Sequence, residues 1–511
     1  RTDAAAIWAT GEFWWQIPRT IQVVLEGKLR PGVAGKDVII TLCGLYNHDE
    51  ALNAAVEFAG PGVASLSMDA RLTIANMSTE WGALVGWFPV DDVTIRYLRQ
   101  RRASLETRGI QRLTKADIDR WAADPPAPDK DARYAARITL DLGTVTPHVS
   151  GPDSVQVMES VSGMAPEHVA IQKAYIVSCV NSRLEDLEAA ARVLRGRKVA
   201  DGVELYVAAA SAEVQAAAEQ TGAWGTLVDA GAKTLPPGCG PCIGLGTGLL
   251  EPGEVGISAT NRNFKGRMGS RDAKAYLASP QVVAASAAAG YITDEGTGAG
   301  VDPGTSPDYR FERLALPVER ESVEILDGFP ERVVGRLVFL PKDNLNTDGI
   351  YGKDYTYKEG MTPEEMAAVV MKNYDPAFTE RVHAGDILVG AANFGTGSSR
   401  EQAATALKFA GIPLVIAASF SQTYLRNAYN NGYPCIEAPD FVEWLRELRQ
   451  DDVAAGTLTV IPGDEVEVDF ANSSITYRGE SFGFPALGAV AQALVVAGGI
   501  EAQIRTVKRE G

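Results

Sequence analysis

Three of the five cysteines are spaced so that they could do chemistry together. Cys239 and Cys242 form a C-x-x-C pair, and Cys179 directly follows the apolar run 174–178. A C-x-x-C pair can bind zinc, bind an iron–sulfur cluster or carry out thiol redox chemistry. No histidine lies close in the sequence to complete four zinc ligands, whereas three thiolates fit a cluster with one open, Lewis-acidic iron. The spacing therefore favours a cluster over zinc and leaves zinc open as the alternative.

A second stretch places two glycines, two serines and an arginine between a predicted strand, 386–390, and a predicted helix, 403–410. A chain that turns through glycine into a helix directs free backbone N–H groups at one point, which suits an anion. Arg400 can bind a carboxylate through two hydrogen bonds. A serine held among such donors could act as a base in its alkoxide form. Taken alone, the stretch favours a simpler interpretation in which a serine caps the helix.

Charge limits what the chain can bind. The 511 residues carry a net charge of −17, which argues against a general nucleic-acid binder. An anionic substrate would need a local group of basic side chains, and Arg262, Arg267 and Arg400 could supply one. The chain has no apolar run long enough to cross a membrane. Five irregularly spaced cysteines indicate a reducing compartment rather than a disulfide framework.

Alternating strand and helix patterns must position these side chains. Runs 174–178 and 203–209 are predicted strands, each followed by a predicted helix, which favours a parallel sheet covered on both faces. Ligands bind such sheets beyond the carboxyl ends of the strands, where Cys179 would lie. We also predict a strand over 36–44 and a helix over 49–59. Asn76 and Glu80 lie four residues apart, so on a helix they would share a face.

Proline-rich and glycine-rich stretches suggest where the chain divides. Residues 124–129 and 293–307 are predicted linkers. The expected domains are therefore 1–124, 125–300 and 321–511. The chain begins at Arg1 in what looks like the interior of a domain, so we expect an N-terminal segment to be missing.

Four motifs in this order resemble the aconitase superfamily, and the match spans nearly the whole chain. They are residues 178–183 (SCVNSR), 237–242 (PGCGPC), 260–267 (TNRNFKGR) and 397–401 (GSSRE). Within the superfamily, residues 1–11 and 348–352 look most like the fungal mitochondrial homoaconitases of lysine biosynthesis. The implied fold is α/β: an aconitase-like three-layer α/β/α iron–sulfur body with a C-terminal swivelling β/α domain.

The resemblance implies a reversible hydro-lyase, a monomer of the mitochondrial matrix, that interconverts homoisocitrate and cis-homoaconitate. Its partner would be a small-molecule tricarboxylate, with neither nucleic acid nor membrane. A [4Fe–4S] cluster would bind the three cysteines. Ser398 would be the base and Glu80 a further catalytic residue. The implied substrate-binding residues are Arg262, Arg267, Ser399, Arg400, Asn76 and Asn261.

Two departures from the family pattern bear on the substrate. Aconitases have Asp-Ser-His where this chain has Asp3-Ala4-Ala5, which disfavours plain aconitase. The family also carries Asp–His pairs in a segment ahead of Thr2. The alternatives are 3-isopropylmalate dehydratase or aconitase within the class, and outside it a non-catalytic iron-responsive RNA-binding relative or a structural zinc protein.

Overall fold

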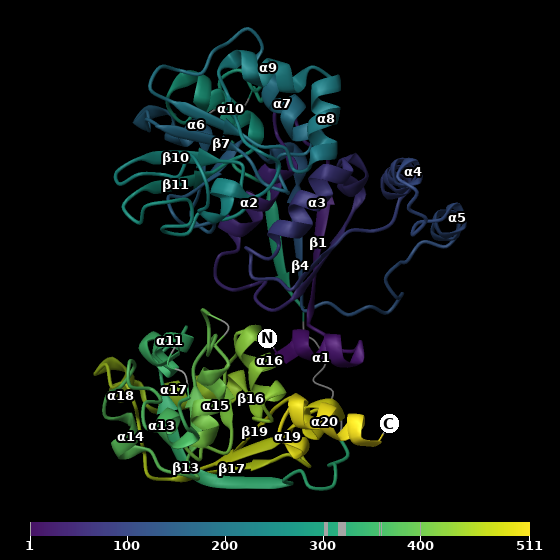
Figure 1. Ribbon diagram of the computed structural model, residues 1–511. Helices are drawn as coiled ribbons and strands as arrows, with labels where there is room; N and C mark the ends of the chain where they lie inside the picture. The colour runs from purple at the N-terminus through teal and green to yellow at the C-terminus, as the bar shows by residue number, and fades with distance from the viewer. Residues whose placement is uncertain are drawn as a thin grey trace. The chain divides into compact units, whose positions relative to one another are not determined.

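The computed structural model describes residues 2–300, 305–314, 323–356, 358, 360–398 and 400–510. Its contacts group the chain into two compact units: a larger unit, Ile17–Leu316, and a smaller unit, Arg1–Gln16 with Pro317–Gly511. Both units are drawn in Figure 1, and each is described by itself. Among the described residues, no helix combines the length and apolarity needed to span a bilayer.

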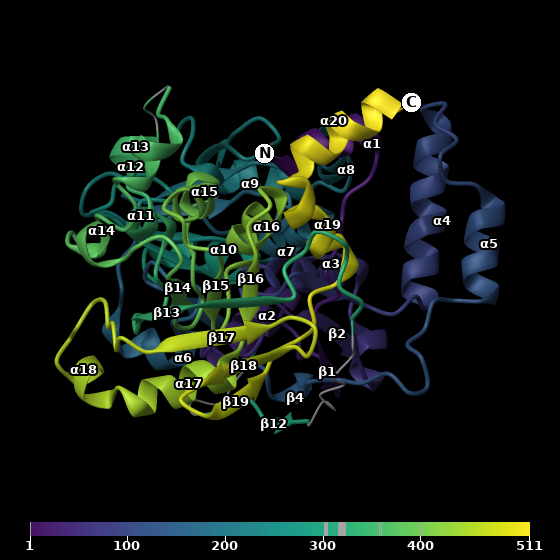
Figure 2. The same cartoon turned by 90° about the horizontal axis from the view of Figure 1, so that it is seen from below.

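The larger unit contains two sheets. The five-stranded sheet has the order β12-β4-β1-β2-β3, in which only β12 runs antiparallel to its neighbour. Its strands are β1 (Thr20–Glu26), β2 (Ala55–Ala59), β3 (Val85–Trp87), β4 (Ala136–Asp141) and β12 (Tyr309–Arg313). Two helices, α4 (Asp92–Thr107) and α5 (Lys115–Ala123), lie side by side as a hairpin (Figure 2).

The seven-stranded sheet of the larger unit has the order β6-β5-β11-β10-β7-β8-β9, and the strands from β11 to β9 are parallel. They are β7 (Lys173–Ile176), β8 (Glu204–Val207), β9 (Lys233–Thr234), β10 (Val255–Ser258) and β11 (Lys274–Leu277), beside β5 (His148–Ser150) and β6 (Met158–Ser160). Ala174 and Ile176 pack into one hydrophobic cluster, and Tyr175 and Val177 pack into another. Because successive side chains of a strand point to opposite faces, this sheet is buried on both sides, as predicted.

The expected domain ranges differ from this grouping. Residues 124–129 are irregular, but β1 pairs with β4 across them, so one sheet spans that predicted boundary. Residues 2–16 group with the C-terminal part of the chain. There Asp3 accepts hydrogen bonds from Arg426 at 2.9 and 3.0 Å, and Trp14 donates to Asn430 at 2.8 Å. The predicted start at residue 321 lies outside the described residues, as does part of the second predicted linker, 301–304.

The predicted strand over 36–44 is wrong. These residues form the helix α2 (Gly35–Leu45), and every residue from Gly35 to Cys43 is buried. A short apolar run fits a buried helix as well as a buried strand, and periodicity cannot separate the two. Packing selects the helix: a Cβ on Gly35 would lie 2.8 Å from the Cα of Ala70 in α3 (Met68–Met77), so only glycine permits this close approach.

The predicted helix over 49–59 is also wrong. Asp49 and Asn53 adopt left-handed backbone conformations, with φ of 64° and 57°, which a continuous α-helix cannot contain. The regular part of this stretch is the strand β2, which pairs in parallel with β1 and β3. Strand pairing therefore overrode the local helical pattern.

The smaller unit is built on a seven-stranded sheet with the order β16-β15-β14-β13-β17-β18-β19. Its parallel half contains β13 (Arg332–Leu340), β14 (Ile387–Gly390), β15 (Val415–Ala417) and β16 (Cys435–Glu437); its antiparallel half contains β17 (Glu465–Asp469), β18 (Ser474–Tyr477) and β19 (Glu480–Gly483). Its helices include α15 (Gln402–Phe409), α16 (Gln422–Asn430) and α19 (Ala489–Ala497). The hairpin predicted from 465–470 and 474–477 is confirmed.

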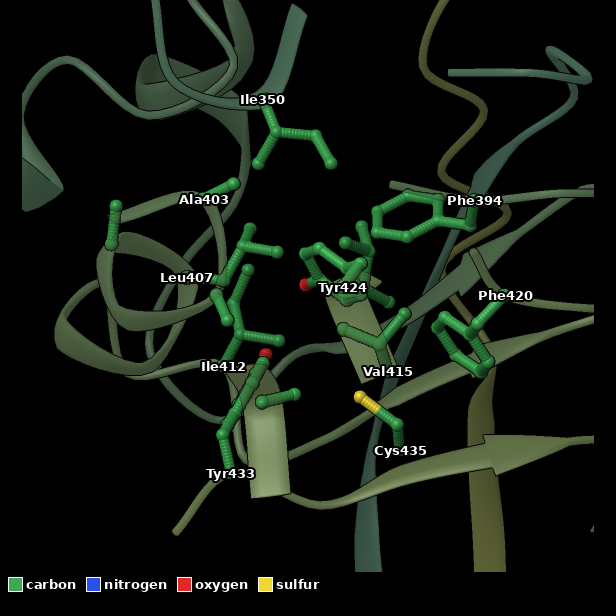
Figure 3. Packing of buried hydrophobic residues seen from close by; sticks show 14 of the residues in the cluster. Ile350, Phe394, Ala403, Leu407, Ile412, Val415, Phe420, Tyr424, Tyr433 and Cys435 are labelled. Atoms are coloured by element: carbon green, nitrogen blue, oxygen red, sulfur yellow. The ribbon is translucent and has the colours of Figure 1, made fainter. Parts of the chain in front are cut away.

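A buried cluster supports the loop between β14 and α15 (Figure 3). The ring of Phe394 meets that of Tyr424 edge-on, with centroids 5.3 Å apart. The next residue, Gly395, has a φ of 76°, and a Cβ there would lie 2.2 Å from the Tyr424 ring. Glycine is therefore required for the chain to leave β14 and pass over this aromatic core.

Candidate active site

The parallel strands β7 and β10 end side by side and carry two of the predicted site segments. Residues 173–175 pair in parallel with residues 256–258, so Cys179 and Asn261 follow adjacent strand ends at the same edge of the sheet. Ser178 has a φ of 126°, and its Oγ accepts the N–H groups of Val180 at 3.3 Å and Asn181 at 3.1 Å. This turn leaves Cys179 exposed.

The C-x-x-C pair lies on the short 3₁₀ turn η4 (Gly240–Ile243). The N–H of Cys242 donates to the carbonyl of Cys239 at 2.9 Å and closes the turn. The Cys239 side chain is exposed, and that of Cys242 is partly buried. Cys43 and Cys435 are fully buried, which agrees with the packing role predicted for them.

Electrostatics place the three thiols within reach of one another. Burial raises the pKa of the Cys242 thiol, and the Arg267 guanidinium opposes that rise. The charges of Cys239 and Cys179 raise the pKa of Cys242 further, which requires both groups to be nearby. The Nε of Arg267 donates to the backbone carbonyl of Cys242 at 2.9 Å. The prediction that Arg267 lies at the same sheet edge as the cysteines is confirmed.

Among the described residues, no group of three or more His, Cys, Asp or Glu side chains is placed to hold a single metal ion. A structural zinc site requires such a group, with four ligands around one ion. A cluster takes each thiolate on a different iron, so its cysteines need not converge on one point. Three neighbouring thiols, two of them exposed, with Arg267 beside them therefore fit a cluster better than zinc.

Asn76 and Glu80 reach the turn that follows β10. Asn261 donates to Asn76 through the side-chain amides, and the Nε of Arg262 donates to Glu80 at 2.6 Å. The predicted shared helical face is wrong for this pair, because α3 ends at Met77 and Glu80 lies in the turn after it. The Glu80 side chain is 5% exposed, and its Oε2 has no hydrogen-bond partner among the described residues. That oxygen is available to a ligand.

Lys36 is a buried cation that sequence reasoning missed. Its Nζ donates to the carbonyls of Thr260 at 2.5 Å and Ala259 at 3.4 Å, directly ahead of Asn261 and Arg262. Burial lowers the pKa of Lys36 to about 8, and the negative charges of Glu80 and Cys242 oppose that fall. The available signal was a lysine inside an apolar run, since buried lysines are rare unless paired.

Replacing Lys36 tests whether it holds this turn. We expect Lys36→Met to lower the free energy of unfolding by about 1–3 kcal/mol, because methionine fills the space but leaves two buried carbonyls without their donor. Thermal or urea unfolding measures the change. Lys130→Met, at an exposed site, is the control and is expected to stay within about 0.5 kcal/mol of the wild type. Equal stability of Lys36→Met and the wild type would refute the role given to Lys36.

Asp186 gives stability a predictable pH dependence. It lies in the first turn of α7 (Leu184–Leu194), where its carboxylate accepts the N–H of Arg183 at 3.1 Å. Burial raises the pKa of Asp186 to about 7. The folded chain therefore binds more protons than the unfolded chain between about pH 4 and 7, so this contribution is complete below pH 4 and is lost as pH rises through 7.

We therefore expect Asp186→Asn to flatten the pH dependence of unfolding. Relative to this variant, the wild type should lose up to about 1.4 kcal/mol for each pH unit between 5 and 7. Urea unfolding of both proteins at pH 5, 6, 7 and 8 measures the difference. Parallel curves for the two proteins over that range would show that Asp186 is already ionised at pH 5.

The serine–arginine loop belongs to the smaller unit. Ser398 is exposed, and its backbone carbonyl accepts the N–H of Arg400 at 2.8 Å. The Nη1 of Arg400 donates to Asp348 at 2.7 Å and to the carbonyl of Tyr351 at 3.0 Å. The hydrogen bond from Arg400 holds the pKa of Asp348 below its usual range. Ser399 lies outside the described residues.

The helix-cap interpretation of this loop is wrong. The helix α15 begins at Gln402 and its flanking residue is Glu401, so Ser398 lies beyond the capping position. The Ser398 hydroxyl is therefore not occupied by the helix end. The two groups of predicted site residues lie on different units: the cysteines, Asn76, Glu80, Asn261, Arg262 and Arg267 on the larger unit, and Ser398 and Arg400 on the smaller.

The fold and these residues define an α/β protein in which the carboxyl edge of a parallel sheet carries thiols, amides and arginines. A model of the aconitase family (aconitate hydratase) matches residues 1–290, and a model of the aconitase C-terminal domain matches residues 311–440. The first match covers more than half of the chain. The chain belongs to the aconitase family.

Several curated relatives are similar over most of the chain, and their printed name is "Homoaconitase, mitochondrial". The relative from Eremothecium gossypii is 54% identical over 490 residues, covering 91% of this chain and 71% of its own length. Those from Cryptococcus neoformans and Mycosarcoma maydis are 50% and 49% identical, each covering 99% of this chain and 76% of the relative. Resemblance to the aconitase superfamily, predicted from four motifs, is thereby confirmed.

Among solved structures, a 3-isopropylmalate dehydratase from Methanocaldococcus jannaschii is 29% identical and matches 35% of this chain and 99% of its own. Its TM-score of 0.30 is too low to support a structural conclusion.

Proposed function

We propose that this chain is a hydro-lyase of the homoaconitase type, which reversibly dehydrates homoisocitrate to cis-homoaconitate in lysine biosynthesis. Identity near 50% to homoaconitases over almost the whole chain carries this proposal. The gathering of Cys179, Cys242 and Arg267 at one sheet edge supports it, because a polycarboxylate needs both a Lewis acid and fixed cations.

In this proposal Cys179, Cys239 and Cys242 hold a [4Fe–4S] cluster. Two of the three thiols are exposed, so they can reach a ligand without refolding, and Arg267 favours their ionised form. When bound, the cluster supplies an open iron that polarises the substrate hydroxyl and one carboxylate.

The chain's own residues would bind and orient the carboxylates. Arg262 and Arg267 on the larger unit and Arg400 and Ser399 on the smaller supply positive charge and donors, with Asn76 and Asn261 as amide partners. Arg400 is held by Asp348 and Tyr351, so it would lose little conformational freedom when a carboxylate binds. Ser398 would take the carbon-bound proton, and the unpartnered oxygen of Glu80 would serve the departing hydroxyl.

The remaining parts of the proposal concern the setting. The names of the relatives support a mitochondrial matrix enzyme. A net charge of −17 fits a small-molecule enzyme rather than a nucleic-acid binder. We propose that it acts as a monomer.

Anaerobic cluster reconstitution followed by three parallel assays tests the proposal. We expect hydration of cis-homoaconitate to have a kcat/KM at least about 10-fold above that of cis-aconitate or isopropylmaleate, since one methylene in a pocket changes transition-state binding by this order. Iron and sulfide analysis of the same sample distinguishes a cluster from zinc. Turnover of isopropylmaleate alone would make the protein a 3-isopropylmalate dehydratase, and one zinc without sulfide would defeat the cluster.

A further inference from the structure

Thr347 lies directly against the loop that carries Ser398. It is the first residue of the short helix α11 (Thr347–Ile350), and 2% of its surface is exposed. Its N–H donates to the carbonyl of Thr396 at 2.8 Å. Its Oγ1 lies 3.1 Å from the Ser398 carbonyl oxygen and 3.1 Å from the Ser398 Oγ. All of these atoms belong to the smaller unit.

The Thr347 hydroxyl has one proton and two neighbours that can accept it. While Ser398 is neutral, Thr347 can donate to the Ser398 carbonyl, and the Ser398 hydroxyl can donate to the free lone pairs of Thr347. If Ser398 loses its proton, the alkoxide becomes the stronger acceptor, and the Thr347 O–H can rotate toward it. The Ser398 carbonyl is not left unpaired by this rotation, because the N–H of Arg400 also donates to it at 2.8 Å.

We infer that Thr347 is a positioning residue that orients the Ser398 hydroxyl and then stabilises its anion by turning a single hydroxyl proton. The inference rests on the proposed role of Ser398 as the base. It adds a buried donor that is present before any substrate binds. Removing one donor to a developing oxyanion typically costs about 10²–10³ in kcat, and this is the scale expected here.

A thiol at position 398 measures the anion's environment without a cluster or turnover. In Ser398→Cys, the pH dependence of iodoacetamide alkylation, followed on the peptide that contains residue 398, gives the pKa of that thiol. Adding Thr347→Val should raise the midpoint by about one pH unit, because valine keeps the shape of threonine but cannot donate. Adding Thr347→Ser, which keeps the hydroxyl, should restore it.

A matched control separates this effect from the general cost of losing a buried hydroxyl. Thr459 is also in the smaller unit, fully buried, and donates to Asp375 at 2.6 Å. Thr459→Val should leave the alkylation midpoint of the thiol at position 398 unchanged. An equal midpoint with threonine and valine at position 347, in folded protein, would overturn the inference.

Kinetics of the reconstituted enzyme distinguish this inference from the proposed function. Thr347→Val should lower kcat by about 10²-fold or more with KM changed less than about threefold, and Thr347→Ser should recover most of it. Full activity of Ser398→Ala would remove Ser398 as the base and so refute the proposed function. An inactive Ser398→Ala together with a fully active Thr347→Val would refute only the role given to Thr347.

Discussion

Ser398→Ala is expected to lose at least about 10²–10⁴ in kcat while its iron and sulfide content stays that of the wild type. The alanine cannot accept the carbon-bound proton. It also removes only a side chain whose hydrogen-bond partner among the described residues is Thr347, so folding should be unaffected. Turnover of cis-homoaconitate, with iron and sulfide analysis of the same preparation, measures both parts of this expectation.

Ser481→Ala is the matched control for that substitution. Ser481 is an exposed serine on the strand β19 of the same unit, away from the loop that carries Ser398. We expect this variant to keep wild-type kcat and cluster content. Loss of the cluster in Ser398→Ala would show that the serine has a structural role, and retained kcat would assign the base to another residue.

Cys239→Ala should abolish cluster binding and, with it, all turnover. Changes to residues that merely support a metal ligand typically cost 10- to 100-fold in affinity, so loss of a ligand itself should exceed about 100-fold. Iron and sulfide per chain after reconstitution, together with the visible absorbance of the cluster, measure the loss. Because Cys239 is exposed, the cluster-free variant should unfold within about 0.5 kcal/mol of the cluster-free wild type.

Cys43→Ala provides the opposite pattern and so serves as the control for the ligand assignment. Cys43 is fully buried in α2, and burial raises the pKa of its thiol, so it cannot readily form a thiolate. Its replacement should lower stability by about 1 kcal/mol through lost packing and leave cluster content unchanged. Wild-type cluster content in Cys239→Ala would remove Cys239 from the ligand set.

The sequence anticipated the elements best where the two periodicities alternate clearly. From 174 to 221 each apolar strand run is followed by an amphipathic helix, and β7, α7, β8 and α8 (Ala212–Gln220) appear as predicted. The pattern failed at α2, because a helix buried on every side has no polar face to reveal its period. It failed at 49–59 because two left-handed residues, Asp49 and Asn53, leave no trace in a hydrophobic pattern.

The candidate site was only partly visible in the sequence. Motifs identified the cysteines, Arg262, Arg267, Ser398 and Arg400, but not their partners. Lys36 is separated by more than 200 residues from the carbonyls it holds, and Thr347 by 51 from Ser398. Neither contact has a local pattern, because each joins segments that only the folded chain brings together.

By itself, the sequence determined the family, the α/β class and the residue types that could do the chemistry, since strand periodicity and short motifs are local properties of a chain. Only the tertiary structure decided that residues 36–44 coil into a buried helix, that Glu80 meets Arg262 with one oxygen left unpartnered, and that a buried threonine contacts Ser398. These outcomes depend on packing and on hydrogen bonds between distant segments, whose free energies no local pattern contains.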